Sequence, residues 1–393
     1  MTPSFFPPKT SRLSWRSKAF RGLACQAIAL ILVIALGAYL MHNVSQNMRV
    51  RGIHSGFDFL SQSAGFSIGE SVVPFDSNDS YGKAFLVGLS NTLRVAIASV
   101  ILATLLGTAI GIGKLSRNFL LRTLCSAYVQ AFRNVPLLLQ LFMWYFVMTE
   151  LLPPVTSAIQ PVAGLFLSKN GLQFPIPVWV NGQWMTLAGL LAGAIGAWFW
   201  TRQTKRHLYA TGRLWPSFWP CVAIVMAAAL VGWLLGGSPS AIDIPEQSEL
   251  SITGGGAVTP EYLTMVIGLT IYNASFIAEI VRSGIQSVPF GQHEAAAALG
   301  LPPGREIRLI QMPQALRVII PPLTSQYLNI TKNASLAVAI GYPDLVSISN
   351  TSINQTGRAI ECISLVMACY LTLSLLMAAF MNVYNKRAVI KER

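Results

Sequence analysis

Long apolar stretches separated by short polar segments run through the whole chain. A helix needs about 20 mainly apolar residues to cross the hydrocarbon core, and in lipid its backbone groups must be hydrogen-bonded within the segment. The pattern therefore predicts an all-α integral membrane protein with about eight transmembrane helices. The predicted spans are residues 23–41, 84–113, 128–152, 184–200, 218–236, 261–281, 317–340 and 360–384.

The basic residues between the spans predict which side of the membrane each segment faces. Lys and Arg accumulate in the short cytoplasmic loops of membrane proteins. With the N-terminus inside, the predicted inner segments hold 21 of the 28 Lys and Arg residues. Because an even number of spans brings the C-terminus back to the same side, both termini are predicted to be cytoplasmic. The first span lacks a convincing cleavage site before His42, so it is predicted to remain as an anchor.

Composition argues against several functional classes. Only 11% of the residues are charged, and the net charge of +13 lies in short clusters between apolar runs, unlike the continuous basic face of a nucleic-acid-binding protein. The five cysteines form no CxxC pair. His293 and Glu294 begin an HExxH pattern, but Ala297 stands where the second ligand is needed. Neither nucleic-acid binding nor a metal site is predicted.

Glycine spacings within the spans predict packing and not catalysis. Residues 107–114 approach a phosphate-binding loop, but Thr108 replaces its first glycine and Leu115 replaces the Ser or Thr that would bind magnesium. This chain is therefore not expected to bind ATP. GxxxG spacings at 107/111, 189/193 and 232/236 predict that helix backbones approach closely.

The inner segment between the sixth and seventh spans has the pattern of a helical hairpin. Residues 292–299 are rich in helix formers, and Gly300 is placed to end that helix in a left-handed conformation. Pro302 and Pro303 cannot extend this helix but can open another. A second short helix over residues 303–311 is predicted to pack back on the first, outside the membrane.

This segment resembles the EAA signature of ABC importer permeases, in which Glu-Ala-Ala, Gly, Ile and Leu-Pro recur at fixed spacing. In that family the hairpin is a coupling helix that sits in a groove of a separate ATPase subunit. The resemblance implies that Ala295 and Ala296 allow close docking and that Glu294 meets a basic partner. With Met312 in place of Leu, the implied ATPase-coupling residues are Gln292, Glu294, Ala295, Ala296, Gly300, Ile310 and Pro313.

Further stretches resemble polar amino-acid permeases. Residues 132–142, FRNVPLLLQLF, match a segment of that family, and residues 272–289 resemble the segment leading into its coupling loop. The resemblance covers about residues 88–384 and implies the type I ABC importer permease fold (MetI-like). It is interrupted over residues 153–260, and that insertion, together with the added first span, resembles the general L-amino-acid permeases.

The implied organisation places one permease domain at the centre of the chain. Outside the membrane the insertion holds Asp243, Glu246 and Glu249 beside three glycines, a composition that predicts a flexible polar loop. The expected regions are a cytoplasmic tail (1–22), an extra helix (23–41), a periplasmic segment (42–83), the permease domain (84–384) with its insertion (153–260), and a cytoplasmic tail (385–393).

The resemblance also implies partners in the bacterial inner membrane. A cytoplasmic ABC ATPase dimer would hold ATP and magnesium, so this chain is expected to be a transport subunit with no cofactor and no catalytic residue. A second permease subunit, a homologue or a second copy, would complete the channel in the lipid bilayer. A periplasmic amino-acid-binding protein would deliver amino acids for uptake into the cytoplasm.

Polar and charged side chains within spans are the candidates for the substrate path, because burying them in lipid is costly. These are Arg94, Asn273, Glu279 and Lys332. Structural alternatives stay open for the charged ones: Glu279 can neutralise Arg282 three residues on, Arg94 can snorkel outward, and Lys332 can pair with a neighbouring helix.

Two other functional classes fit the sequence less well. A secondary transporter driven by an ion gradient would need paired inverted repeats with broken helices, and no convincing repeat is found. A membrane enzyme would need a nucleophile with a nearby base or a metal cluster, and no such pattern is found. An ATP-driven amino-acid importer is the function that the sequence supports best.

Overall fold

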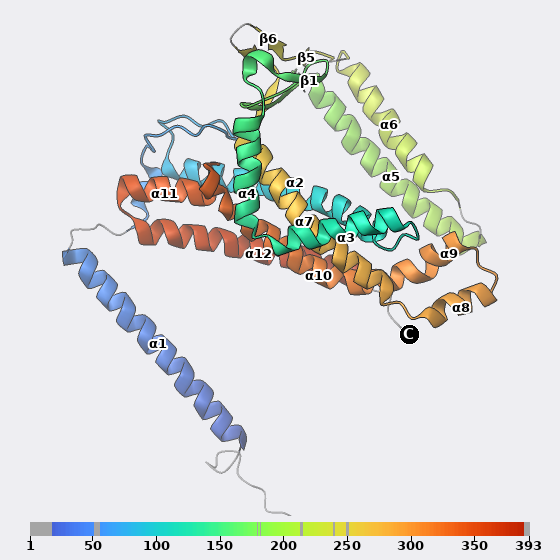
Figure 1. Cartoon of the computed structure of the whole chain (residues 1–393), viewed down its shortest axis with the longest axis horizontal. Coiled ribbons are helices and arrows are strands. Elements are labelled where there is room, and N and C mark those ends of the chain that lie inside the picture. Colours follow the sequence, from blue (N-terminus) through green and yellow to red (C-terminus); the bar gives the residue numbers. More distant parts are fainter. Residues whose placement is uncertain are drawn as a thin grey trace, which may run out of the picture. The chain divides into compact units, whose positions relative to one another are not determined.

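The computed structural model describes residues 18–50, 56–178, 180, 182–212, 215–238, 240–248 and 251–388 (Figure 1). Most of the predicted tail 1–22, the end of the tail 385–393, and Glu249 of the predicted polar loop lie outside the described residues. The chain forms two compact units, residues 1–90 with 344–375 and residues 91–343 with 376–393. Each unit is described by itself.

The first unit combines helices from both ends of the chain. Its core is apolar and includes Phe59, Tyr81, Phe85 and Leu345. The apolar side chains of its first helix are exposed along most of its length, as suits a helix surrounded by lipid. The helical elements are α1 (Lys18–Val50), η1 (Asp58–Ser61), the first residues of α2 (Tyr81–Gly113), α11 (Leu345–Thr356) and most of α12 (Ala359–Ala388).

The second unit is a helical bundle in which α7 is the most buried helix. It contains the rest of α2 and α12. The GxxxG prediction is confirmed in α2, because an added Cβ at Gly107 or Gly111 would lie 2.8 or 2.7 Å from backbone oxygens of α7. The helical elements are α3 (Phe119–Asn134), α4 (Leu137–Phe146), η2 (Val147–Leu151), η3 (Val155–Ser157), α5 (Gln183–Thr211), α6 (Phe218–Leu235), α7 (Pro260–Gln286), α8 (Phe290–Ala298), α9 (Pro303–Glu306), η4 (Ile307–Gln311), α10 (Met312–Asn333) and η5 (Ala334–Ile340).

Within the described residues, six helices are long and apolar enough to cross a membrane, and a bent pair raises the number to seven. The protein is therefore a mainly helical multi-pass membrane protein, as predicted. The predicted span 317–340 corresponds to α10 and η5 and does not meet the same criterion. Its polar residues, among them Gln326, Lys332 and Asn333, lower its mean hydropathy.

The predicted span over residues 128–152 is not one continuous helix. The chain bends by 104° between α3 and the pair formed by α4 and η2. Pro136 causes the break, because proline forces the preceding residue out of helical geometry, and Val135 is extended with φ −100° and ψ 130°. The Gln140 amide then donates hydrogen bonds of 2.9 Å to the Phe132 and Val135 carbonyls, which satisfies the broken helix end.

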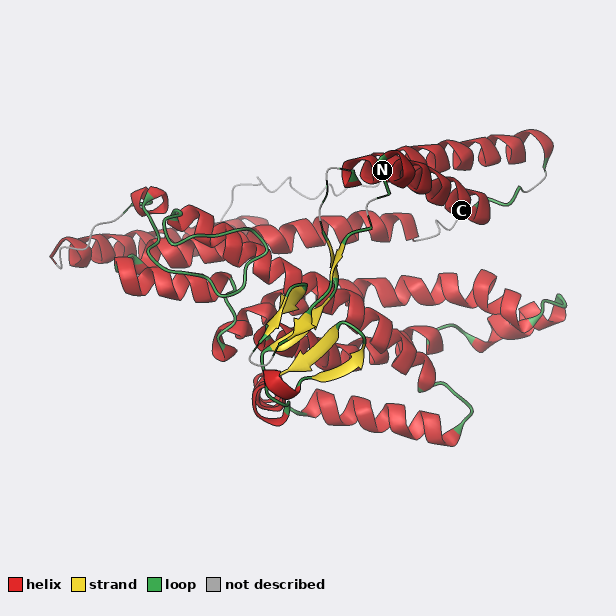
Figure 2. Cartoon of the chain, turned by 90° about the horizontal axis from the view of Figure 1, so that it is seen from above, coloured by secondary structure: helices red, strands yellow, loops and turns green. Residues whose placement is uncertain are grey.

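The insertion contains ordered strands where a flexible loop was predicted. Four strands form one antiparallel sheet in the order β1-β2-β3-β8, and β4-β5 and β6-β7 form two short ribbons. Asp243 lies in β5 and Glu246 in β6, so the polar segment is tied down by backbone pairing. Figure 2 shows the strands gathered together. The strands are β1 (Ile159–Val162), β2 (Leu165–Ser168), β3 (Gly171–Phe174), β4 (Ile176–Pro177), β5 (Ile242–Asp243), β6 (Glu246–Gln247), β7 (Ile252–Thr253) and β8 (Gly256–Val258).

Helices α5 and α6 of the insertion form an antiparallel pair with backbone contact along its length. An added Cβ at Gly189 would lie 2.4 Å from the Ala228 carbonyl oxygen, and one at Gly232 would lie 2.3 Å from the Met185 oxygen. Both glycines belong to the predicted GxxxG spacings, so close packing is confirmed there as well. Helices α5 and α6 lie side by side in Figure 1.

Candidate functional site

The predicted hairpin between α7 and α10 is present. Its first arm is α8, which matches the predicted helix 292–299 within two residues at its start and one at its end. Gly300 follows with φ +68°, the left-handed conformation predicted for it. An added Cβ there would meet no atom within 4 Å, so backbone conformation and not crowding requires glycine.

The second arm starts at Pro303 as predicted but does not end at Gln311. It continues through α9 and the π-helical turn η4 directly into α10. Met312 lies in helical geometry and residues 304–312 hold no proline, so no residue there stops the helix. The second arm of the hairpin is thus continuous in helical geometry with α10 of the bundle.

Side-chain contacts hold the two arms together. His293 Nδ1 on α8 lies 2.5 Å from Glu306 Oε1 on α9, and the Glu306 side chain is buried. Gln314 Nε2 also donates to Gln292 Oε1 at 3.2 Å. The sequence analysis missed Glu306. The only local signal for it is its position, one helical turn after Pro302. Gln292 therefore lies within the hairpin's own contacts.

The exposed face of α8 differs from the one expected. Ala296 is 0% exposed and packs within its own chain, so it is not available to a docking partner in this conformation. Glu294 and Ala295 are exposed, whereas Ile310 and Pro313 are half-buried. Two large apolar side chains that the sequence analysis did not single out are also exposed, Phe290 at 71% and Leu299 at 79%. They lie at the two ends of α8.

The Asn273 side chain is fully buried between helices. Its Nδ2 donates to the Leu269 carbonyl at 2.7 Å, and its Oδ1 accepts from Gln326 Nε2 at 2.7 Å. The amide therefore links α7 to α10 within the bundle. A buried amide pair of this kind stabilises helix contact because both partners are satisfied.

Glu279 is neutralised by two cations. Its Oε2 accepts from Lys114 Nζ at 2.6 Å, and its Oε1 accepts from Arg282. In this conformation Glu279 pairs with Arg282, as the structural alternative expected, and Lys114 is a second partner that the sequence analysis did not single out. The contact joins the end of α2 to α7 shortly before the hairpin.

Arg94 and Lys332 lie in different surroundings. The Arg94 guanidinium lies over the Tyr262 ring, 4.1 Å from its centroid, which is a favourable cation–π contact. Lys332 is exposed and forms no ion pair within the described residues. Arg94 therefore contacts an aromatic ring, whereas Lys332 is exposed.

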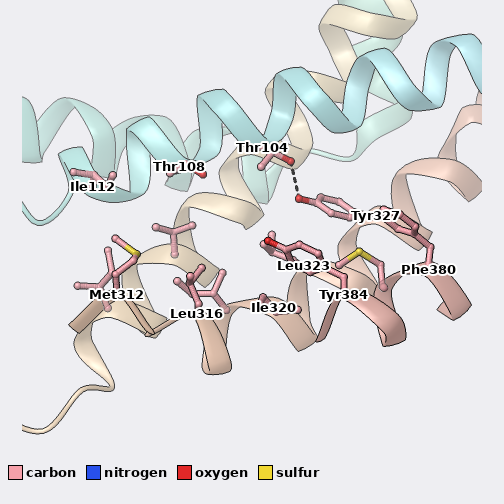
Figure 3. Close-up of a pocket in the computed structure, with 14 residues that line it drawn as sticks. Thr104, Thr108, Ile112, Met312, Leu316, Ile320, Leu323, Tyr327, Phe380 and Tyr384 are labelled. Atoms are coloured by element: carbon pink, nitrogen blue, oxygen red, sulfur yellow. Dashed lines mark hydrogen bonds between the residues drawn. The ribbon is translucent and has the colours of Figure 1, made fainter. Parts of the chain in front are cut away.

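A cavity of about 380 Å³ lies between α2, α7, α10 and the end of α12. Figure 3 shows Thr104 and Thr108 on α2 facing the α10 side chains Leu323 and Tyr327. The Thr104 and Tyr327 hydroxyls share a hydrogen bond of 2.9 Å, and the rest of the lining is mainly apolar. None of the four predicted path residues lines this cavity.

Comparison with known proteins gives one family. Residues 185–391 match the family described as binding-protein-dependent transport system inner membrane component. The chain is 41% identical to the general L-amino acid transport system permease protein AapQ of Rhizobium johnstonii, over 95% of this chain and 94% of the relative. It is 42% identical to the putative amino-acid ABC transporter permease protein YhdX of Escherichia coli, over 97% of each chain.

A third relative covers a still larger share. The chain is 38% identical to the glutamate/glutamine/aspartate/asparagine transport system permease protein BztB of Rhodobacter capsulatus, over 98% of this chain and 99% of the relative. The match with these permeases includes both the insertion and the hairpin. The chain therefore belongs to the binding-protein-dependent transport system inner membrane components.

Proposed function

We propose that this chain is the permease subunit of an ATP-driven importer that carries amino acids into the cytoplasm. Three permeases to which it is similar over nearly its full length are named for amino-acid transport. In this proposal a binding protein in the periplasm delivers the substrate, and a second permease, a homologue or a second copy, completes the channel. Both termini face the cytoplasm of the bacterium.

The observation that carries the proposal is the hairpin. It is stiff, its arms are joined by the His293–Glu306 contact, and its second arm runs unbroken into α10. A force applied to α8 by a closing ATPase dimer would therefore reach the bundle with little loss in a flexible linker. The ATPase dimer would bind ATP and magnesium, and the exposed residues Phe290 and Glu294, with Leu299 at the end of α8, would meet it.

Lys332 is the candidate for contact with substrate in this proposal. Its charge is exposed, and no acidic side chain of the described residues neutralises it. An amino-acid carboxylate would supply the missing partner. Arg94 stays a second candidate through its position in α2.

The coupling role is tested by two valine variants of the same hairpin. Gly300→Val places a β-branched residue at a left-handed position, which costs roughly 1–3 kcal/mol, and tilts or frays the end of α8. Gly304→Val is the matched control, since Gly304 has ordinary φ and open space around it. We expect the first variant to insert into the membrane but lose uptake and binding-protein-stimulated ATP hydrolysis. The control keeps both.

The measurement is co-purification of the ATPase subunit in detergent, together with its stimulated turnover. Glu294→Lys reverses an exposed charge without touching the spans and is expected to weaken ATPase retention as well. If Gly300→Val and Glu294→Lys both retain the ATPase and full stimulation, the hairpin is not the coupling element and the proposal loses its main support.

A further inference from the structure

The α5–α6 hairpin has one strongly basic end. Between Glu150 and Asp243 the sequence contains no acidic residue. Apart from Lys169, its basic residues are Arg202, Lys205, Arg206 and, outside the described residues, Arg213. No ion pair within the described residues involves Arg202, Lys205 or Arg206, and all three are exposed. The counter-charge for this end must come from outside the hairpin.

Three basic and two aromatic side chains form a single line on α5. Counted from Trp198, the other four side chains follow at four, seven, eight and eleven residues. Residues at these spacings lie on one face of a helix. The Arg202 guanidinium lies 3.8 Å from the Trp198 ring centroid, and Tyr209 is 87% exposed. We name the basic stripe as Trp198, Arg202, Lys205, Arg206 and Tyr209.

The loop after α5 covers the opposite face of the helix. Trp215 stacks on His207 with centroids 4.2 Å apart and on Trp200 at 6.0 Å. At 100° per residue, Trp200 and His207 point away from the basic stripe. Trp215 therefore packs on the face opposite the basic stripe, whose three basic residues are exposed.

Helix length places the stripe at a membrane surface. The 29 residues of α5 span about 43 Å, well beyond the ~30 Å hydrocarbon core, whereas the 18 residues of α6 span about 27 Å. The Trp200 indole donates to the Pro216 carbonyl at 3.5 Å, just before α6 begins. Residues after Trp200 thus extend past the paired, lipid-embedded length, and Trp and Tyr beside Arg and Lys are typical of the interface.

We propose that the basic stripe binds the headgroup of an anionic phospholipid. The phosphate would accept hydrogen bonds from Arg202, Lys205 and Arg206, while the acyl chains would lie along the exposed apolar side of α5, where Leu191, Ile195 and Phe199 are exposed. The site belongs to the insertion and would anchor that hairpin in one leaflet.

The test measures lipid binding to the full chain purified in detergent. Native mass spectrometry compares the binding of the anionic lipid dioleoylphosphatidylglycerol with that of the zwitterionic lipid dioleoylphosphatidylcholine. We expect the native chain to prefer the anionic lipid by at least about tenfold, and Arg202→Gln/Lys205→Gln/Arg206→Gln to lose that preference while binding the zwitterionic lipid as before. The charge-conserving control Arg202→Lys/Lys205→Arg/Arg206→Lys keeps the preference.

Lys205→Gln alone serves if the triple variant does not fold, with an expected severalfold weakening. An unchanged preference in the folded glutamine variants overturns the proposal. So does a variant that keeps its lipid preference but no longer co-purifies with the ATPase subunit, because the stripe would then be a protein contact. Failure here leaves the importer proposal intact, since the stripe lies outside the α8 hairpin.

Discussion

Asp344 is a buried carboxyl at the start of α11. It is the N-cap of that helix, and its Oδ1 accepts from the Ser347 amide at 2.8 Å. Its Oδ2 is buried without a hydrogen-bond partner. Burial is the main cause that raises the pKa of this carboxyl from 3.8 to about 7, against the opposing effect of the amide hydrogen bonds.

The raised pKa of Asp344 makes the stability of the folded protein depend on pH. Between about pH 4 and 7 the folded protein holds a proton that the unfolded chain has released, so stability falls as pH rises through that window and is flat above it. Asp344→Asn keeps a good N-cap without the charge. We expect the variant to be more stable than the native protein by a few kcal/mol at pH 8 and by much less at pH 5.

Thermal unfolding in detergent at the two pH values checks this expectation. Ser347→Ala is a useful control, because it leaves the carboxyl and the Ser347 backbone amide in place and should not alter the pH dependence. An equal gain from Asp344→Asn at pH 5 and pH 8 would show that the carboxyl is not protonated in the folded protein.

At the scale of the element, the α5–α6 pair depends on contact glycines, among them Gly189. Gly189→Val would force side-chain atoms into the Ala228 carbonyl, which is backbone and cannot yield, so the helices must separate. Gly196→Ala is the matched control, since its added Cβ would meet only an Ile224 side-chain atom at 3.0 Å. We expect the valine variant to unfold in detergent at a lower temperature than the control. Its free energy of unfolding should fall by roughly 1–3 kcal/mol or more, which is the usual cost of overpacking. Equal temperatures for the two variants would contradict the packing described.

Sequence patterns predicted the elements that local chemistry decides. Gly300 ends α8 and Pro303 opens α9 because backbone conformation at those positions depends on the residue itself. The break at Pro136 follows the same chemistry, because proline restricts the residue before it, but the predicted span 128–152 ran across it since the whole stretch is apolar. The GxxxG spacings predicted contact correctly without naming the partner helix.

Elements that depend on distant residues were not predictable in this way. The strands of the insertion are two to four residues long, too short for an alternating pattern, and β3 pairs with β8, whose register joins Leu172 to Val258. The Asn273–Gln326 and Lys114–Glu279 contacts likewise join different helices. Polar residues inside apolar spans marked Asn273 and Glu279 as unusual, but only the fold supplies their partners.

At the scale of the whole molecule, the antiparallel α5–α6 pair makes the membrane orientation testable. Gly212 follows the end of α5 with φ +70°, and Gln247 lies in β6, beyond the far end of α6. Gly182 and Gly236 are in backbone contact, so the opposite ends of the pair are well defined. Arg202, Lys205 and Arg206 gather near Gly212, and the positive-inside rule predicts that this end lies in the cytoplasm.

A reporter enzyme that is active only in the periplasm distinguishes the two orientations. Fused after Gly212 it should be silent, and fused after Gln247 it should be active, because one span separates the two points. A fluorescent reporter that matures only in the cytoplasm should give the opposite pair of signals and controls for expression. Reversed signals would invert the hairpin and place the Arg202 end outside. Equal signals at both points would mean that α6 does not cross the membrane, and the insertion would then lie on one side of it.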